Sequence, residues 1–324
     1  MEKAPVVVFA FNRSDHLEKT LKALNDCKDA QDSQLFIFCD QWKKETQKES
    51  VEKVRNLVDN FVLISNFKNT TVVKADQNKG LAKSIIEGIT AIIHQFGKVI
   101  VLEDDLIVTK NFLQYMNEAL TFYENADDVW AISGYTFDME ALKDYKHDIY
   151  YAGRGCSWGW ATWENRWNSV DWQVASYSKF KYNIAKRRAF GKWGKDLPQM
   201  LDMQMGMDIN SWAIRWCYEA FKQKKYTIYP KYSYLSNIGI DGSGVHSAYA
   251  DKGMAEKYQA NISQNPEYIV KFERLNEDRK IRRQFQKHFS NGFISDTKDI
   301  IKSLMIRLGW WQSYERRKKQ RKEK

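Results

Sequence analysis

Three adjacent carboxylates, Glu103-Asp104-Asp105, directly follow the apolar run 99–102. Such a run predicts a buried strand, and acids at its end are costly to bury without water, cations or a metal. Mg²⁺ and Mn²⁺ bind carboxylate oxygens and leave coordination positions for phosphate oxygens, so the triplet can hold a metal–diphosphate complex. The residues alone leave a second interpretation open, in which the acids cap the next helix or pair with lysines.

The elements that would position this triplet alternate between two patterns. The sequence predicts buried strands at residues 6–11 and 35–39, and further strands at residues 71–74, 98–102 and 129–132. Apolar residues at helical spacing lie between them, from Ser14 onward, over 45–60, after Gly80 and around 112–123. This alternation predicts an α/β fold, Rossmann-like, with a mostly parallel sheet covered by helices on both faces. In such sheets ligands bind beyond the carboxyl ends of the strands.

Composition sets wider bounds. The chain has 324 residues, of which 43% are hydrophobic, enough for a sizeable core. It holds no apolar run of membrane-spanning length, its N-terminus lacks a signal-peptide pattern, and its four cysteines form no C-x-x-C pair. We therefore expect a reduced, cytoplasmic protein without a zinc site.

The C-terminal region is strongly basic. Residues 315–324 contain seven lysines or arginines and two glutamates, within a chain of net charge +10. An apolar stripe with two tryptophans over 300–311 precedes them. This pattern suits an anionic membrane surface, although a solvated tail and a stripe packed on the main domain explain it equally well. Nucleic-acid binding is disfavoured because no recognised RNA- or DNA-binding motif accompanies the charge.

Tryptophan is dense between residues 153 and 172, where the regular alternation has ended. Five of the twelve tryptophans lie there, at positions 158, 160, 163, 167 and 172. We expect most of them in the core, with Trp158 and Trp160 as candidates for a wall on which a sugar ring stacks.

We divide the chain into a donor-binding half (1–135), an acceptor-side half of the same compact domain (136–250) and a charged helical extension (251–324).

The order of the motifs along residues 5–250 resembles that of the GT-A fold glycosyltransferases. The resemblance is to the N-acetylglucosaminyltransferase I branch and to bacterial family 2-like surface-polysaccharide glycosyltransferases. The motifs that carry it are Asn12-Arg13, Asp40, Asn78-Lys79-Gly80, Glu103-Asp104-Asp105-Leu106, and the segments 157–163, 211–216 and 237–246.

This resemblance implies a metal-dependent enzyme that moves a sugar from a nucleoside-diphosphate sugar to a hydroxyl of a glycan or lipid-linked acceptor. It implies Mn²⁺ or Mg²⁺ as cofactor, an inverting reaction, and a role in surface polysaccharide or lipopolysaccharide synthesis. Because the physical need is for a stabilised leaving diphosphate, the metal would supply that stabilisation. The enzyme would act in the cytoplasm, at the inner face of the plasma membrane.

The resemblance also assigns roles to residues, several of which have a plainer alternative. Asp105 would bind the metal, Asp104 the ribose or the metal-bound diphosphate, and Glu103 would support the loop. Asp40 would face the base or cap a helix, Lys79 and Lys83 would meet the donor or lie on the surface, and His246 would be a second metal ligand or a surface group. The remaining donor-site candidates are Phe11, Asn12, Arg13, Trp158 and Trp160.

The general base is the point where the sequence departs from the family. Relatives place an aspartate one or two residues before the position of Trp212, whereas this chain has Asn210-Ser211, and neither can act as a base near neutral pH. Asp208 is the nearest carboxylate, so it is the candidate base, with a helix N-cap as its alternative role. The departure keeps open a non-catalytic nucleotide- or carbohydrate-binding protein on the same fold.

Overall fold

The structure is a computed structural model, and it describes residues 2–241, 256–263, 265, 268–290, 305 and 310. Its strands are β1 (Val6–Ala10), β2 (Gln34–Cys39), β3 (Asn69–Lys74), β4 (Lys98–Glu103), β5 (Leu106–Val108), β6 (Val129–Ser133), β7 (Ile149–Ala152), β8 (Trp160–Trp163), β9 (Tyr226–Pro230) and β10 (Leu235–Asn237). Its longer helices are α1 (Ser14–Asn25), α2 (Lys48–Val62), α3 (Leu81–Phe96), α4 (Phe112–Phe122), α9 (Leu197–Met205), α10 (Trp212–Lys222) and α12 (Arg279–His288). Shorter helices are α5 (Glu140–Lys143), α6 (Glu164–Trp167), α7 (Tyr177–Lys181), α8 (Ile184–Phe190) and the 3₁₀ turn η3 (Gly191–Trp193).

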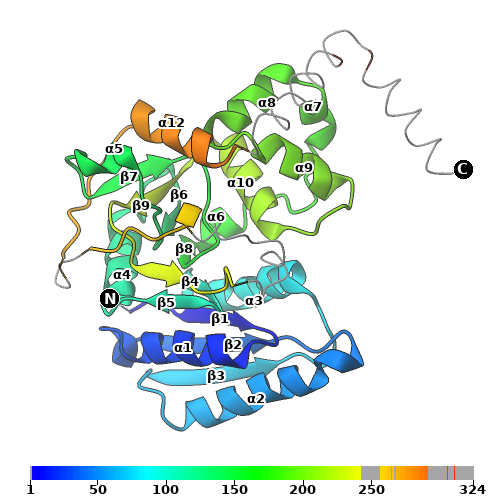
Figure 1. The fold of residues 1–324 in the computed structure, drawn as a ribbon, viewed down its shortest axis with the longest axis vertical. Coiled ribbons are helices and arrows are strands. Elements are labelled where there is room, and N and C mark those ends of the chain that lie inside the picture. Colours follow the sequence, from blue (N-terminus) through cyan, green and yellow to red (C-terminus); the bar gives the residue numbers. More distant parts are fainter. Residues whose placement is uncertain are drawn as a thin grey trace, which may run out of the picture.

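One large sheet organises the molecule, with strand order β3-β2-β1-β4-β8-β6-β9-β7 (Figure 1). The first four strands in this order are parallel to one another. β8 enters antiparallel between β4 and β6, and β6 pairs parallel with β9. The predicted α/β class with a mostly parallel sheet is confirmed. The sheet also continues across residue 135, so strands from both sides of that boundary share one core.

Alternate residues of the central strands face two separate hydrophobic layers, as the pleat of a strand requires. Val6 and Val8 of β1 pack in the layer that contains α1, α2 and α4, whereas Val7 and Phe9 pack in the layer that contains α3 and α10. Both layers consist of fully buried side chains, each worth about 1.5–3 kcal/mol relative to exposure. Burial on both faces explains why these strands read as unbroken apolar runs.

The strands and helices predicted for residues 6–132 are all present, with ends that differ by a few residues. Ser14 begins α1, but its side chain does not cap the helix, because the N-cap residue is Arg13 and no side-chain cap hydrogen bond forms. Beyond residue 136 no pattern predicted β7, β8 or β9, whose pairing partners lie far away in the chain. No helix among the described residues is both long and apolar enough to cross a bilayer.

Candidate active site

The polar residues that follow β1, β2 and β4 meet at one edge of the sheet. These strands are parallel and in register, with Ala10 beside Cys39 and Phe9 beside Glu103. The residues after their ends are therefore brought together, as the α/β topology requires. Arg13 comes from the end of β1, Asp40 from the end of β2, and Asp104 and Asp105 from the turn between β4 and β5.

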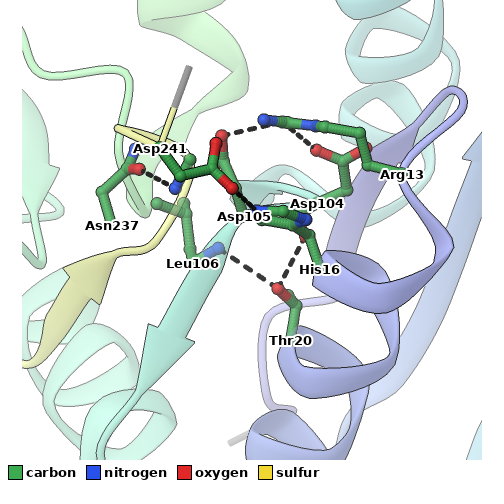
Figure 2. A network of polar contacts seen from close by, with 9 residues as sticks. Arg13, His16, Thr20, Asp104, Asp105, Leu106, Asn237 and Asp241 are labelled. Atoms are coloured by element: carbon green, nitrogen blue, oxygen red, sulfur yellow. Dashed lines mark hydrogen bonds and ion pairs between the residues drawn. The ribbon is translucent and has the colours of Figure 1, made fainter. Parts of the chain in front are cut away.

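Helix α1 holds the Asp104-Asp105 turn from one side. The Thr20 hydroxyl donates to the Asp104 carbonyl oxygen over 2.9 Å and accepts the Leu106 N–H over 3.1 Å (Figure 2). Thr20 is fully buried, so both of its hydrogen bonds are shielded from water. One hydroxyl thus fixes the backbone on both sides of Asp105.

Arg13 bridges the two aspartates. Its Nη2 donates to Asp104 Oδ1 and, over 2.7 Å, to Asp105 Oδ2 (Figure 2). Asp104 and Asp105 are only 4% and 9% exposed, so without this cation two negative charges would stand almost buried. The backbone of Phe11 adds a hydrogen bond to the Asp104 carboxylate. Phe11 and Arg13, two of the donor-site candidates, therefore both contact the acidic turn.

The segment after β10 closes the other side of the turn. β10 pairs antiparallel with β5, and the Ile238 N–H donates to the Asp105 carbonyl oxygen over 2.9 Å. A Cβ on Gly239 would lie 2.8 Å from Asp105 Cγ and 2.9 Å from Arg13 Nη1, so only glycine allows this approach. Asp241 Oδ2 then contacts His16 Nε2 at 3.0 Å, which ties the segment to α1 (Figure 2).

Burial and neighbouring charges shift the pKa values of the residues in this turn. Burial, together with the charges of Asp105 and Asp104, raises the pKa of Glu103 to about 8 against the opposing charge of Arg13. Burial also raises the pKa of Asp104, against the opposing charge of Arg13. Burial lowers the pKa of Arg13, but Asp104 and Asp105 outweigh it and carry this pKa above its ordinary range. The two aspartates carry more negative charge than the single guanidinium of Arg13 can balance, so the turn can accept further positive charge.

These residues suit a divalent metal that is shared with a substrate. Mg²⁺ in phosphoryl sites is held by one or two carboxylates together with phosphate oxygens. Asp104 and Asp105, which converge on a single guanidinium nitrogen, are such a pair. Within the part of the chain that the structure describes, no three His, Cys, Asp or Glu side chains form a complete cage. His246, the predicted second ligand, lies outside the described residues.

Asp40 uses both carboxylate oxygens to shape the loop before α3. Oδ1 accepts the N–H groups of Gln41 and Lys79, each over 2.9 Å, and Oδ2 accepts the Gly80 N–H over 2.9 Å. Asn78 Nδ2 also donates to Oδ2, over 3.2 Å. Asp40 therefore secures the start of α3, where Gly80 is the N-cap residue. Of the two roles foreseen for Asp40, the helix-end role is the one with visible contacts.

Lys79 and Lys83 converge on a glutamate. The ammonium groups of Lys79, before α3, and Lys83, on α3, lie 2.7 Å and 3.6 Å from the carboxylate of Glu87 on α3. Both side chains are substantially exposed, so these ion pairs are weak and can be exchanged for other partners. Asn12, the other candidate after β1, is partly buried.

The two candidate tryptophans have different environments. Trp160 is 1% exposed and packs against Trp212, Trp167 and Trp216, so its ring offers no face to a donor. That placement corrects the expectation for Trp160, because its position in β8 directs the ring into the layer under α3 and α10. Trp158 precedes β8, near the carboxyl end of β4, and is only partly buried. It remains the candidate for a sugar-stacking ring.

Asp208 lies in the turn between α9 and α10 and is exposed. It does not cap α10, because Ser211 is the N-cap and its Oγ accepts the Ile214 N–H over 3.3 Å. Asn210, which stands near the family's acid position, accepts a hydrogen bond from Arg215 Nη2 over 3.3 Å. The helix-cap alternative for Asp208 is therefore wrong, and its carboxylate is accessible.

Three residues that form the site were not predicted from the sequence. Thr20 carried a usable signal, since it is a polar residue on the helix face that also bears Leu17, Leu21 and Leu24. His16 lies one turn earlier, and its partner Asp241 is 225 residues away. Gly239 was included only as part of the motif segment 237–246, because its contact with Asp105 depends on the pairing of β10 with β5.

Comparison with known proteins agrees with this geometry. Residues 1–190 match the GNT-I family. The alpha-1,3-mannosyl-glycoprotein 2-beta-N-acetylglucosaminyltransferase of Arabidopsis thaliana is 21% identical over 337 residues, which cover 93% of this chain and 69% of that protein.

Solved structures of glycosyltransferases are also similar to this chain. For residues 1–349 of S. aureus TarS the TM-score is 0.36 with 14% identity, over 78% of this chain and 70% of that one. For the mannosyltransferase PcManGT of Pyrobaculum calidifontis, solved with GDP-Man and Mn²⁺, the TM-score is 0.36 with 11% identity, over 50% of this chain. The match spans 45% of that mannosyltransferase, less than half of its length.

An open, mostly parallel sheet carries an acidic turn at the carboxyl end of β4, and the family match makes the chain a glycosyltransferase. The matched segment covers more than half of the sequence, and the chain belongs to the GNT-I family. The class and the family expected from the order of the motifs are thereby confirmed.

Proposed function

We propose that this glycosyltransferase is metal-dependent and transfers a sugar, of the hexose or N-acetylhexosamine class, to a hydroxyl of a glycan or lipid-linked acceptor. The observation that carries the proposal is the convergence of Asp104, Asp105 and Arg13 at the carboxyl ends of β1 and β4. A bound Mn²⁺ or Mg²⁺ would stabilise the charge that develops on the leaving diphosphate. Asp105 is the residue that we assign to the metal, with Asp104 beside it.

Arg13 has a second part in this proposal. Its guanidinium neutralises both aspartates as the site stands, and guanidinium groups bind phosphate oxygens as well as carboxylates. Arg13 can therefore leave Asp105 and pair with the donor diphosphate without exposing an uncompensated charge. The Gly239 segment, which contacts Asp105 and Arg13, keeps the two groups close during this exchange.

The acceptor side is assigned from Asp208 and Trp158. An inverting transfer needs one base that removes the proton of the acceptor hydroxyl. Asp208 is exposed and precedes α10 by a few residues, which supports it as this base. Trp158 is partly buried near the end of β4, where its ring can stack on a sugar.

The setting that we propose is the cytoplasmic side of a membrane where surface polysaccharide or lipopolysaccharide is assembled. All four cysteines are free, which suits a reducing compartment. The basic segment 315–324 would contact anionic lipid.

A second candidate function has a specific observation in its favour. Asn210 stands near the family's acid position and is hydrogen-bonded to Arg215, so no carboxylate is available at that position. A chain that binds nucleotide sugar without transferring it would show this arrangement.

One experiment separates the two. The wild type and Asp208→Asn are incubated with nucleotide sugars, Mn²⁺ and a panel of glycan acceptors, and products are detected by mass spectrometry. We expect the wild type to transfer the sugar. In Asp208→Asn the rate of transfer should fall by about 10²- to 10⁴-fold while donor binding is retained. Full turnover in Asp208→Asn would place the base elsewhere, and donor binding without any transfer by the wild type would support the binding protein.

A further inference from the structure

Helix α12 is divided into an apolar face and a basic face. At 3.6 residues per turn, Ile281 and Phe285 lie together on one side, and both are fully buried. The opposite side carries four basic residues, all of them exposed: Arg279, Lys280, Arg283 and Lys287. The apolar face is already occupied by the protein, so the basic face is the one that remains for a partner.

The helix is held firmly in place. Phe285 packs against Phe137, Trp193 and Tyr229, with ring centroids 5.1–5.5 Å apart. Gln286 Nε2 donates to the Gly191 carbonyl oxygen over 3.1 Å, and Asp278 caps the first turn by accepting the Lys280 and Ile281 N–H groups. The basic side chains therefore project from a fixed platform.

The neighbouring turn extends the positive charge. The 3₁₀ turn η3 packs on α12, and it carries exposed Lys192, with exposed Lys195 just beyond it. Lys195, Arg283 and Lys287 line one open hollow of about 420 Å³, together with Gln286 and Ser290. We call Lys192, Lys195, Arg279, Lys280, Arg283 and Lys287 the α12 basic surface.

Little negative charge opposes this surface. Residues 184–195 and 279–290 contain five lysines or arginines each and no aspartate or glutamate. The nearby acids have partners of their own, since Asp196 pairs with Arg154, Asp202 with Arg187, and Glu277 with Arg282. Lys195 has a contact within the chain, but the other five cations of this surface form no ion pair with another described residue. Such an excess of charge calls for an anionic partner.

We propose that the α12 basic surface docks the protein on an anionic phospholipid bilayer, with a headgroup phosphate seated in the hollow beside Lys195, Arg283 and Lys287. Basic residues that project from one helix and the adjoining turn suit an extended charged plane better than a single small ion.

This surface is separate from the basic C-terminal segment and from the sugar-transfer site. The inference does not rest on the transfer reaction, because the vesicles that test it contain no donor. Since the apolar face of α12 is buried in the protein, the docking is electrostatic rather than insertive. It should therefore weaken steeply as salt shortens the Debye length from about 10 Å at 0.1 M to about 3 Å at 1 M.

The test is flotation of the full chain with two kinds of vesicle. One contains phosphatidylcholine alone, and the other contains phosphatidylcholine with about 30% phosphatidylglycerol, which is enough anionic lipid for a negative surface potential. The test variant is Lys280→Glu/Arg283→Glu/Lys287→Glu, whose three side chains are exposed. The matched control is Lys19→Glu/Lys22→Glu/Lys68→Glu, which reverses exposed lysines on α1 and before β3, at the other end of the molecule in Figure 1. Both variants lower the net charge equally.

We expect the wild type to bind the anionic vesicles at low salt and to ignore the neutral ones. The α12 variant should lose about 100-fold in partition constant, at roughly fivefold for each basic residue, while the control stays within about fivefold. Lys280→Gln/Arg283→Gln/Lys287→Gln should lose somewhat less, and it serves if the reversed variant does not fold. Thermal stabilisation by the donor should be unchanged in all variants.

Three results would overturn the proposal. Equal losses in the α12 and control variants would mean that net charge alone drives binding. Full binding by the α12 variant, or none by the wild type, would remove the surface from membrane contact. Tight, salt-sensitive binding of a DNA duplex that is lost only in the α12 variant, with vesicles ignored, would assign the surface to nucleic acid.

Discussion

Gly239→Ala tests whether the segment after β10 is part of the donor site. A methyl group at this position would lie 2.8 Å from Asp105 Cγ and 2.9 Å from Arg13 Nη1, and closer still to Asp105 Oδ2. The φ angle of Gly239 lies outside the left-handed region, so the cost of the substitution is steric. Overpacking of this kind costs about 1–3 kcal/mol.

The methyl group can be accommodated only if the segment or the carboxylate moves. Either movement would disturb the bond from the Ile238 N–H to the Asp105 carbonyl and the bridge from Arg13 to Asp105. If the cost falls on the donor-bound state, nucleotide-sugar affinity in Mn²⁺ drops by about 5- to 150-fold. Isothermal titration with nucleoside diphosphates measures this loss, and urea unfolding measures the accompanying change in stability.

Gly191→Ala is the matched control. Its new methyl group would meet Pro198 Cγ at 3.6 Å, an ordinary contact, and the φ angle of Gly191 is −72°. Affinity and the free energy of unfolding should stay within about 0.5 kcal/mol of the wild type. Wild-type affinity in Gly239→Ala, with Gly191→Ala equally unaffected, would refute the assignment of this segment to the site.

The remaining predictions concern the pH dependence, the loop before α3 and the tail. Folding raises the pKa of Glu103 from 4.5 to about 8, so between these pH values only the unfolded chain loses the proton. Glu103 therefore lowers the free energy of unfolding as the pH rises, by up to about 1.4 kcal/mol per pH unit. Glu103→Gln should flatten this slope in urea unfolding at pH 5–8 in EDTA, and an unchanged slope would contradict the assignment. Asp40→Asn should lower the free energy of unfolding by about 3 kcal/mol, because the single amide oxygen cannot accept the Lys79 and Gly80 N–H groups together. A decrease below about 0.5 kcal/mol in urea unfolding would show that the loop does not depend on these two hydrogen bonds. Deleting residues 312–324 should weaken flotation with anionic vesicles while donor affinity stays unchanged, and undiminished flotation would exclude the tail from membrane contact.

The first half of the fold was predictable because local pattern and long-range structure agree there. Strands β1, β2, β4 and β6 are buried on both faces and read as apolar runs, and the parallel pairing of β1, β2 and β4 then brings their carboxyl ends together. Asp104 and Asp105 could therefore be placed at the site from sequence. The insertion of β8 between β4 and β6 could not, because antiparallel pairing over such separations has no local signature.

The parts of the site that depend on that long-range pairing were missed for the same reason. Trp160 carries the residue type of a sugar-binding wall, but the pleat of β8 turns its ring into the core. Gly239 reaches Asp105 only because β10 pairs with β5. The bridging role of Arg13 required both strands to end at the same level, which the register of β1 with β4 provides.

The central claim is that Asp105 holds a metal that binds the donor diphosphate. Thermal unfolding of the wild type and Asp105→Ala, with a panel of nucleoside diphosphates and nucleotide sugars and with or without Mn²⁺, tests it most directly. A ligand at 100 times its dissociation constant adds about 2.7 kcal/mol, or roughly 5 °C. We predict such a shift with one nucleotide class, dependent on Mn²⁺ and absent in Asp105→Ala. The same Mn²⁺-dependent shift in Asp105→Ala would contradict the claim.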